Sequence, residues 1–274
     1  MKRMYAAAIK PDDTVEDVFR VVEARLAPYR DASKGQYLHL LLADRSGEVA
    51  ARLWDGAEHH TVWPAAGDVV RISGRATLYR DHIRLRVGHI RPATEDEWSP
   101  TELLAAPDSS EALATIHESL RRITQPELRH LLDSFFGDGQ FMELLLLAPA
   151  HQPGRLVERS AALLELAEPL RTLADDFNHD LLATAILLHA TGYTTALHGA
   201  TAARSLSWLG VAQLSDDLIS ERLAQMPDFP AALSLHLRDA VRYAHHPEAG
   251  HTSEARALAA LIGLYEVLTF KPTS

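Results

Sequence analysis

The chain has 274 residues, enough for two domains or one large one, and its apolar fraction of 47% predicts a buried core. Cysteine is absent, which excludes disulfides, thiolate metal sites and cysteine nucleophiles. The net charge of -10 argues weakly against a nucleic-acid partner, but all of it falls on residues 98–274. No apolar run is long enough to cross a membrane, and the start has too short an apolar stretch for a secretory signal. We therefore expect a cytoplasmic protein.

The first hundred residues have the pattern of short strands. Residues 37–55 hold two apolar runs joined by a turn, and residues 68–90 hold two more strands. In the last strand three apolar residues, Ile83, Leu85 and Val87, alternate with Arg84 and Arg86. About five short strands in this length predict a small closed barrel, and the OB-fold is the commonest barrel of this size that binds nucleic acid.

Arginines gather in the second half of the predicted barrel, where residues 69–91 contain six of them against one acid. Arg84 and Arg86 share one face of a strand, about 7 Å apart, which suits a phosphate backbone; the alternative is an ordinary solvated face. Single-strand binding also uses aromatic platforms. Tyr37, Trp54, Trp63 and Tyr79 could serve, although Trp54 could equally pack under the linker. The predicted nucleic-acid-binding residues are Arg52, Trp54, Arg71, Arg75, Tyr79, Arg80, Arg84 and Arg86.

Residues 92–112 carry three prolines and an acidic cluster, which predict a linker with one short helix that Ser99 caps and Pro100 begins. From about residue 111 onward the pattern is helical throughout. The predicted helices lie at 110–123, 125–136, 155–174, 179–191, 216–226, 231–246 and 253–270. The sequence thus predicts an α+β multi-domain chain, with a barrel over 1–91, a linker over 92–112 and an all-α domain over 113–274.

Four stretches, in this order along the chain, resemble the YhaM-type 3′→5′ exoribonucleases. They are "YLHLLLADRSGEVAARLWD" (37–55), "DLLATAILLHATG" (180–192), "YAHH" (243–246) and "SEARAL" (253–258). Proteins of that family join an OB-fold to an HD-superfamily domain, which binds metal. The resemblance covers most of the chain and implies that its helical domain is HD-like.

Most positions where the resemblance places metal ligands carry other residues. Arg159 stands at the first histidine, Ala190 replaces the aspartate after His189, and Ile262 and Tyr265 occupy aspartate positions; Tyr193 also replaces a lysine. A catalytic metal needs about three well-placed ligands and an open position, and a guanidinium repels it. We therefore expect no bound metal and no catalytic residue, with His189, His245 and His246 as remnants of the site.

Other interpretations of these residues stay open. His189 could be a buried histidine bonded to a backbone carbonyl, and His245 and His246 could contact phosphate or cap the preceding helix. Asp180 is better explained as a residue of a helix start than as a metal ligand. A rebuilt metal site would use His151, Asp180, His189, His245 and His246.

Three functions are compatible with these patterns. The first is a single-stranded DNA- or RNA-binding protein without a cofactor, whose inactive helical domain is a scaffold, a homo-oligomer surface or a dock for a protein partner. The second is a metal-dependent 3′→5′ exonuclease with altered ligands, which would use Mn²⁺ or Mg²⁺. The third is a protein-interaction module whose barrel binds another protein.

Overall fold

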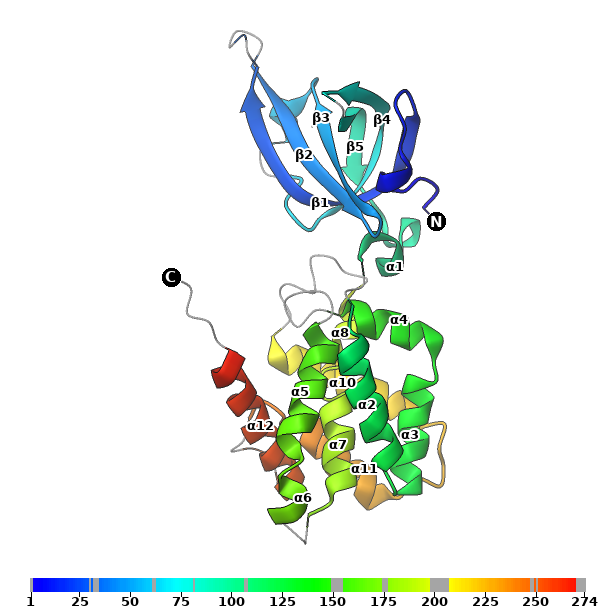
Figure 1. The fold of residues 1–274 in the computed structure, drawn as a ribbon, viewed down its shortest axis with the longest axis vertical. Coiled ribbons are helices and arrows are strands. Elements are labelled where there is room, and N and C mark those ends of the chain that lie inside the picture. The colour runs from blue at the N-terminus through cyan, green and yellow to red at the C-terminus, as the bar shows by residue number, and fades with distance from the viewer. Residues whose placement is uncertain are drawn as a thin grey trace. The chain divides into compact units, whose positions relative to one another are not determined.

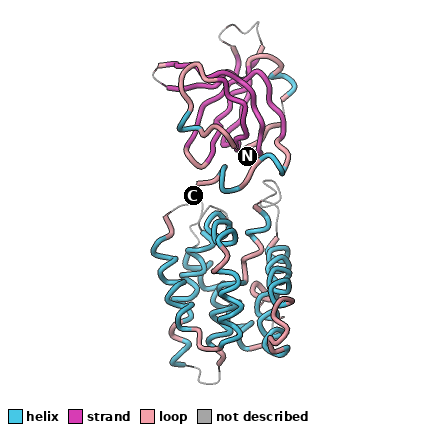
Figure 2. The backbone as a smooth tube through the Cα atoms, turned by 90° about the vertical axis from the view of Figure 1, so that its right-hand side faces the viewer, coloured by secondary structure: helices cyan, strands magenta, loops and turns pink. Residues whose placement is uncertain are grey.

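A computed structural model describes residues 2–29, 31, 35–60, 63–80, 82–105, 108–148, 155–173, 177–197, 207–246, 249 and 251–269. The chain divides into two compact units after residue 106, the first built of strands and the second of helices (Figures 1 and 2). None of the described helices is long and apolar enough to cross a membrane.

The first unit is a closed barrel of five strands. Its strands are β1 (Thr14–Pro28), β2 (Gln36–Asp44), β3 (Gly47–Leu53), β4 (Val69–Tyr79) and β5 (His82–Pro92). Around the barrel the order is β1-β2-β3-β5-β4, and every neighbouring pair is antiparallel except β3 and β5. A five-stranded Greek-key barrel with this order is an OB-fold, so the predicted fold class is confirmed.

Alternation of apolar and polar residues sorts the side chains of each strand into the barrel core or onto its outer face. Leu38, Leu40 and Leu42 of β2 point inward, while Tyr37 and His39 lie on the outer face. The fifteen-residue β1 was not singled out in the sequence, because charged residues such as Asp17 and Glu23 interrupt its apolar pattern. Short 3-10 turns lie at Ala6–Ala8, Ala57–His59 and Glu95–Glu97.

The second unit is helical, as expected. The first unit ends with α1 (Pro100–Leu103), which Ser99 caps in a capping box as its sequence predicts. The helices that follow are α2 (Ser110–Arg122), α3 (Pro126–Phe136), α4 (Gly139–Leu147), α5 (Arg155–Ala167), α6 (Leu170–Leu173), α7 (His179–Leu188), α8 (Tyr193–Ala196), α10 (Trp208–Leu223), α11 (Ala231–Arg242) and α12 (Ser253–Thr269). Helix α7 is the core of this unit, since all its residues from Leu181 to Leu188 are buried.

Several helix boundaries differ from their prediction. The helix expected over 155–174 is interrupted before Pro169, whose ring is incompatible with a helix interior. The helix expected from residue 216 begins eight residues earlier, at Trp208, where Ser207 caps it. The helix expected to reach residue 246 ends at Arg242. Helix α4 was not predicted, because "FMELLLL" is apolar on nearly every side and shows no helical period.

Candidate nucleic-acid interface and the histidine cluster

A row of basic side chains crosses all five strands on the outer face of the barrel. The strand register pairs Arg25 with His39, His39 with Arg52, Arg52 with Arg86, and Arg86 with Arg75. Paired residues of neighbouring strands point to the same side of a sheet, with strands about 4.8 Å apart. These five residues, which we call the basic row, therefore form a band about 19 Å long.

An aromatic cluster lies beside the basic row. The ring centroids of Tyr37 and Trp54 are 4.6 Å apart, and Tyr29 lies 5.6 Å from Tyr37 and 5.3 Å from Trp54. The Tyr29 hydroxyl donates a 2.7 Å hydrogen bond to the Trp54 carbonyl, which fixes the cluster. The guanidinium of Arg52 lies 5.1 Å from the centre of the Tyr37 ring and 5.4 Å from that of Trp54. All three aromatic side chains are partly exposed.

The six arginines of residues 69–91 fall into two groups in the structure. Arg71 and Arg91 both bind Glu97, and Arg75 binds Asp12 at 3.2 Å. Hydrogen bonds from Arg91 lower the pKa of Glu97 to about 2, so this carboxylate stays charged. In contrast, Arg80, Arg84 and Arg86 have no ion pair with a described carboxylate, and neither has Arg52 of β3. The positive charge that the described acids leave free is therefore concentrated on β3 and β5.

The hairpin between β4 and β5 adds a further aromatic residue to the outer face of the barrel. Tyr79 is 46% exposed, and the guanidinium of Arg84 lies 4.2 Å from the centre of its ring. Arg80, at the turn, lies 5.5 Å from the same ring. Trp63, in contrast, packs against the barrel core and the ring of His60.

In the helical unit, Arg159 lies near His189 and His245, two of the histidines that the sequence analysis interprets as remnants of a metal site. Its side chain is 6% exposed, and it forms a 3.2 Å ion pair with Glu266 and lies 5.6 Å from the centre of the Tyr265 ring. His189 is 2% exposed, and its Nδ1 lies 2.7 Å from the Ile186 carbonyl oxygen, as expected for a buried histidine bonded to the backbone. Its Nε2 has no hydrogen-bond partner among the described residues.

Both histidines near Arg159 are neutral at physiological pH. Burial, and next the charge of Arg159, lower the pKa of His189 and of His245 to about 3. Their ring centroids lie 6.3 Å apart. His245 and His246 follow the end of α11 rather than forming its last turn.

The described residues of this cluster do not fit a divalent cation. A buried guanidinium beside both histidines opposes a second positive charge at the same place. No group of three His, Asp or Glu side chains suited to a metal lies in the part of the chain that the structure describes. Asp180, near the other end of α7, accepts hydrogen bonds from Thr124 and Gln125 and so fixes the start of α3. His151 lies outside the described residues.

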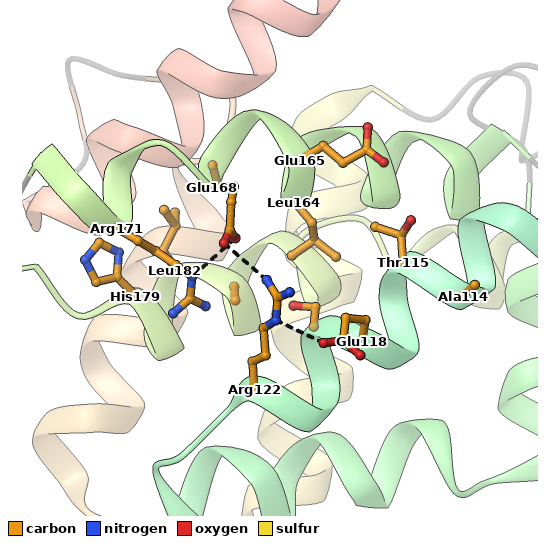
Figure 3. Close-up of a pocket in the computed structure, with 13 residues that line it drawn as sticks. Ala114, Thr115, Glu118, Arg122, Leu164, Glu165, Glu168, Arg171, His179 and Leu182 are labelled. Carbon is orange, nitrogen blue, oxygen red and sulfur yellow. Dashed lines mark hydrogen bonds and ion pairs between the residues drawn. The ribbon is translucent and has the colours of Figure 1, made fainter.

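A cavity of about 400 Å³ lies elsewhere in the helical unit, between α2, α5, α6 and α7 (Figure 3). Its apolar lining includes Leu164 and Leu182. At its rim Glu168 binds both Arg122 and Arg171, at 3.1 and 3.4 Å. Three carboxylates, Glu118, Glu165 and Glu168, accompany these two arginines in the lining, so its charge does not favour an anionic ligand.

Sequence reasoning missed three residues of the barrel face: Arg25, His39 and Tyr29. Arg25 and Tyr29 belong to the region of β1, which was not singled out, and His39 is one histidine in an apolar run. Only the strand register brings them beside Arg52 and Trp54. The predicted residues Arg52, Trp54, Arg75 and Arg86 lie on this face, whereas Arg71 is engaged by carboxylates.

Curated relatives of the chain include 3′-5′ exoribonucleases named YhaM. No protein-family model matches the chain. It is 29% identical to the 3′-5′ exoribonuclease YhaM of Bacillus velezensis over 178 residues, 61% of this chain and 56% of the relative. Its identity to YhaM of Halalkalibacterium halodurans is 29% over 197 residues, 68% and 60% of the two chains. The chain therefore spans little more than half the length of these curated relatives.

Among solved structures, the second OB-fold domain of replication protein A from Methanococcus maripaludis is 22% identical, with a TM-score of 0.28. That likeness covers 34% of this chain and 94% of the other. The OB-fold assignment itself follows from the strand order of the barrel. Over about three fifths of its length the chain is similar to the YhaM-type 3′→5′ exoribonucleases, which confirms the resemblance that its motifs indicate.

Proposed function

We propose that the protein binds single-stranded nucleic acid on the outer face of its barrel. The observation that carries this proposal is the basic row, which runs around the outside of the barrel, with the aromatic cluster beside its member Arg52. Basic side chains on successive strands, whose backbones lie about 4.8 Å apart, suit a phosphodiester backbone that crosses the strands, and the rings of Tyr37 and Trp54 suit stacked bases. The strands β2 and β3 that carry both are the usual ligand face of an OB-fold.

Within this face Arg52, Arg84 and Arg86 are the main phosphate contacts in our proposal. They have no ion pair with a described carboxylate, so a phosphate gains their full charge without displacing an internal partner. Arg75 has an exposed partner in Asp12, and such pairs are weak, so Arg75 is a secondary contact. Tyr79 and Arg80 extend the face toward the β4–β5 turn. Arg71 is the predicted contact that this proposal leaves out.

The helical unit, in this proposal, is a scaffold without nuclease activity. Arg159 supports that role, because its buried charge and its pair with Glu266 occupy the place where the resemblance puts a metal ligand. The alternative is a metal-dependent 3′→5′ exonuclease with altered ligands, which the names of the relatives favour. Homo-oligomer formation and a protein partner remain predictions.

One experiment on the full chain tests binding and cleavage together. A fluorescent 15-nucleotide oligo(U) or oligo(dT) is titrated with protein at several salt concentrations, and the same samples are run on a denaturing gel with Mn²⁺ or Mg²⁺. The test variant is Arg84→Glu/Arg86→Glu. The matched control is Arg3→Glu/Lys10→Glu, which changes the charge equally at two exposed residues that precede β1.

We expect the Arg84→Glu/Arg86→Glu variant to bind at least about tenfold more weakly at 100 mM salt. The slope of log affinity against log salt should fall by about 1.4, because each single-strand phosphate contact contributes about 0.7. The control should stay within about twofold. Equal binding by both variants contradicts the proposed face. If the wild type shortens the strand stepwise and His189→Ala does not, the nuclease alternative is established. A strand that stays intact supports the proposal that the helical unit is a scaffold.

A further inference from the structure

His39 lies in the basic row with an arginine on either side. The register places it directly opposite Arg25 of β1 and directly opposite Arg52 of β3. Directly opposed Cβ atoms in antiparallel strands are about 5 Å apart, so all three side chains can reach one small anion. The imidazole is partly exposed, and the adjoining Tyr37 belongs to the aromatic cluster.

The charged groups around the His39 ring are mostly positive. Arg25 acts on it from β1, Arg52 from β3 and Arg84 from β5, and Glu23 of β1 is the one carboxylate among these described neighbours. Glu23 is itself paired with Arg25 at 2.9 Å. Burial, followed by Arg25 and Arg52, lowers the pKa of His39, so the ring is neutral at pH 7 in the free protein.

One nitrogen of the ring also has no hydrogen-bond partner among the described residues. Its Nδ1 is buried and has no hydrogen bond among the described residues, and the same holds for Nε of Arg52. A buried polar atom without a partner costs free energy, which a ligand can recover if it supplies an acceptor or shifts the side chain toward one. His39 and Arg52 are therefore the unsatisfied pair at the centre of the row.

We propose that Arg25, His39 and Arg52 form a seat for one phosphate of the bound strand, and that His39 takes up one proton when this phosphate binds. The inference rests on the proposed function and adds to it a named subsite and a proton balance. A phosphodiester between the two guanidinium groups brings a negative charge and acceptor oxygens to a ring that otherwise faces positive charge. The proton comes from solvent and stays on the imidazole, which then donates a charge-assisted hydrogen bond to the phosphate.

The seat links affinity to pH in one direction. The bound state holds one more proton than the free state, so binding tightens as pH falls through the pKa of His39 in the complex. The affinity changes by at most tenfold per pH unit, and it stops rising below the pKa that His39 has in the free protein. Phosphodiesters do not titrate in this range, so the ring accounts for the change.

The test measures the affinity of the full chain for the labelled 15-mer at pH 6, 7 and 8 and constant salt. The variant is His39→Gln, and the control is His89→Gln, which removes an exposed histidine of β5 that pairs with Ser73 outside the row. A second probe carries neutral methylphosphonate linkages in place of phosphodiesters. Nuclear magnetic resonance titration of the wild-type His39 ring, with and without the 15-mer, measures its pKa directly.

We expect the wild type and His89→Gln to bind about three- to tenfold more tightly at pH 6 than at pH 8. His39→Gln should bind at every pH about as tightly as the wild type does at pH 8. The neutral probe should lose the pH dependence. Binding whose pH dependence is the same in His39→Gln and wild type, or a His39 pKa that the 15-mer leaves unchanged, overturns the seat but not the proposed function. Absence of binding at every pH overturns both.

Discussion

Lys2 is a buried charged residue of the first unit and lies between the carboxylates of Asp17 and Asp44. It is 8% exposed, and its Nζ lies 3.2 Å from Asp44 and donates a 2.6 Å hydrogen bond to the Val18 carbonyl. The ammonium also lies 3.5 Å from the centre of the Phe19 ring. Burial lowers the pKa of Lys2 despite both carboxylates. Nothing in its sequence context distinguishes it from a surface lysine, because its partners come from β1 and from the end of β2.

Replacement of Lys2 by Met tests this buried charge. The variant leaves two buried carboxylates without their cation, so we expect the free energy of unfolding of the barrel to fall by about 3 kcal/mol. Urea denaturation followed by tryptophan fluorescence measures it. Lys10→Met, at an exposed position, should change stability by less than about 0.5 kcal/mol. Equal stability of the two variants would show that the carboxylates do not need the ammonium.

At the scale of single residues, the sequence predicts on which face of a strand a side chain lies better than it predicts which side chains of other strands lie beside it. Alternation within β5 was enough to place Arg84 and Arg86 on the outer face, and the structure leaves both without a described carboxylate partner. The arrangement of His39 between Arg25 and Arg52 depends on the pairing of three strands. A one-residue slip in either register would separate these side chains. The tight turn between Asp44 and Gly47 sets the β2–β3 register, whereas the longer connection from β1 to β2 leaves the pairing of Arg25 with His39 without such a local signal.

At the scale of elements, periodicity predicts best where one face of an element is buried and the other is solvated. Ten elements have one buried and one solvated face or are long apolar segments, and they lie near their predicted positions. They are β2 to β5, α2, α3, α5, α7, α11 and α12. Helix α4 and strand β1 do not follow such a pattern. Boundaries failed where a local cap or proline decides them, as at Ser207 and Pro169.

The packing of α5, α7 and the segment after α11 makes a prediction about acid. His189 and His245 have a pKa of about 3 in the folded protein, whereas an unfolded histidine has a pKa near 6.5. Below pH 6.5 the unfolded state therefore binds more protons than the folded state. The free energy of unfolding decreases as the pH is lowered from 6.5 to about 3. From pH 7 to pH 5 the helical unit should lose about 2 kcal/mol for each of these histidines.

Urea denaturation followed by circular dichroism at 222 nm, at pH 7 and pH 5, measures this loss. His245→Gln should remove about half of the difference between the two pH values, whatever its effect on stability at pH 7. His117→Gln, at an exposed position on α2, should leave the difference unchanged. Carboxylates with a lowered pKa, such as Asp216 and Asp138, titrate below this window and do not contribute to it. A stability independent of pH between 7 and 5 would contradict the neutral histidines.

For the whole molecule, charge and core both divide at the boundary between the two units. The barrel has its own hydrophobic core, built from β1 to β5 and the residues before β1. The negative charge of the chain belongs to the part that follows the barrel, and it repels a polyanion. Three apolar residues of α12, Leu264, Val267 and Leu268, are exposed in that part.

This division predicts the behaviour of the barrel alone. Residues 1–106 should fold as an independent unit and bind the labelled 15-mer within about threefold of the full chain, or more tightly at low salt, because the acidic part no longer repels the strand. Circular dichroism and tryptophan fluorescence establish that the fragment is folded before its affinity is measured by anisotropy. A folded fragment that binds more than tenfold more weakly would show that the helical unit supplies contacts to the strand. The basic row and the aromatic cluster would then be only one part of the binding surface.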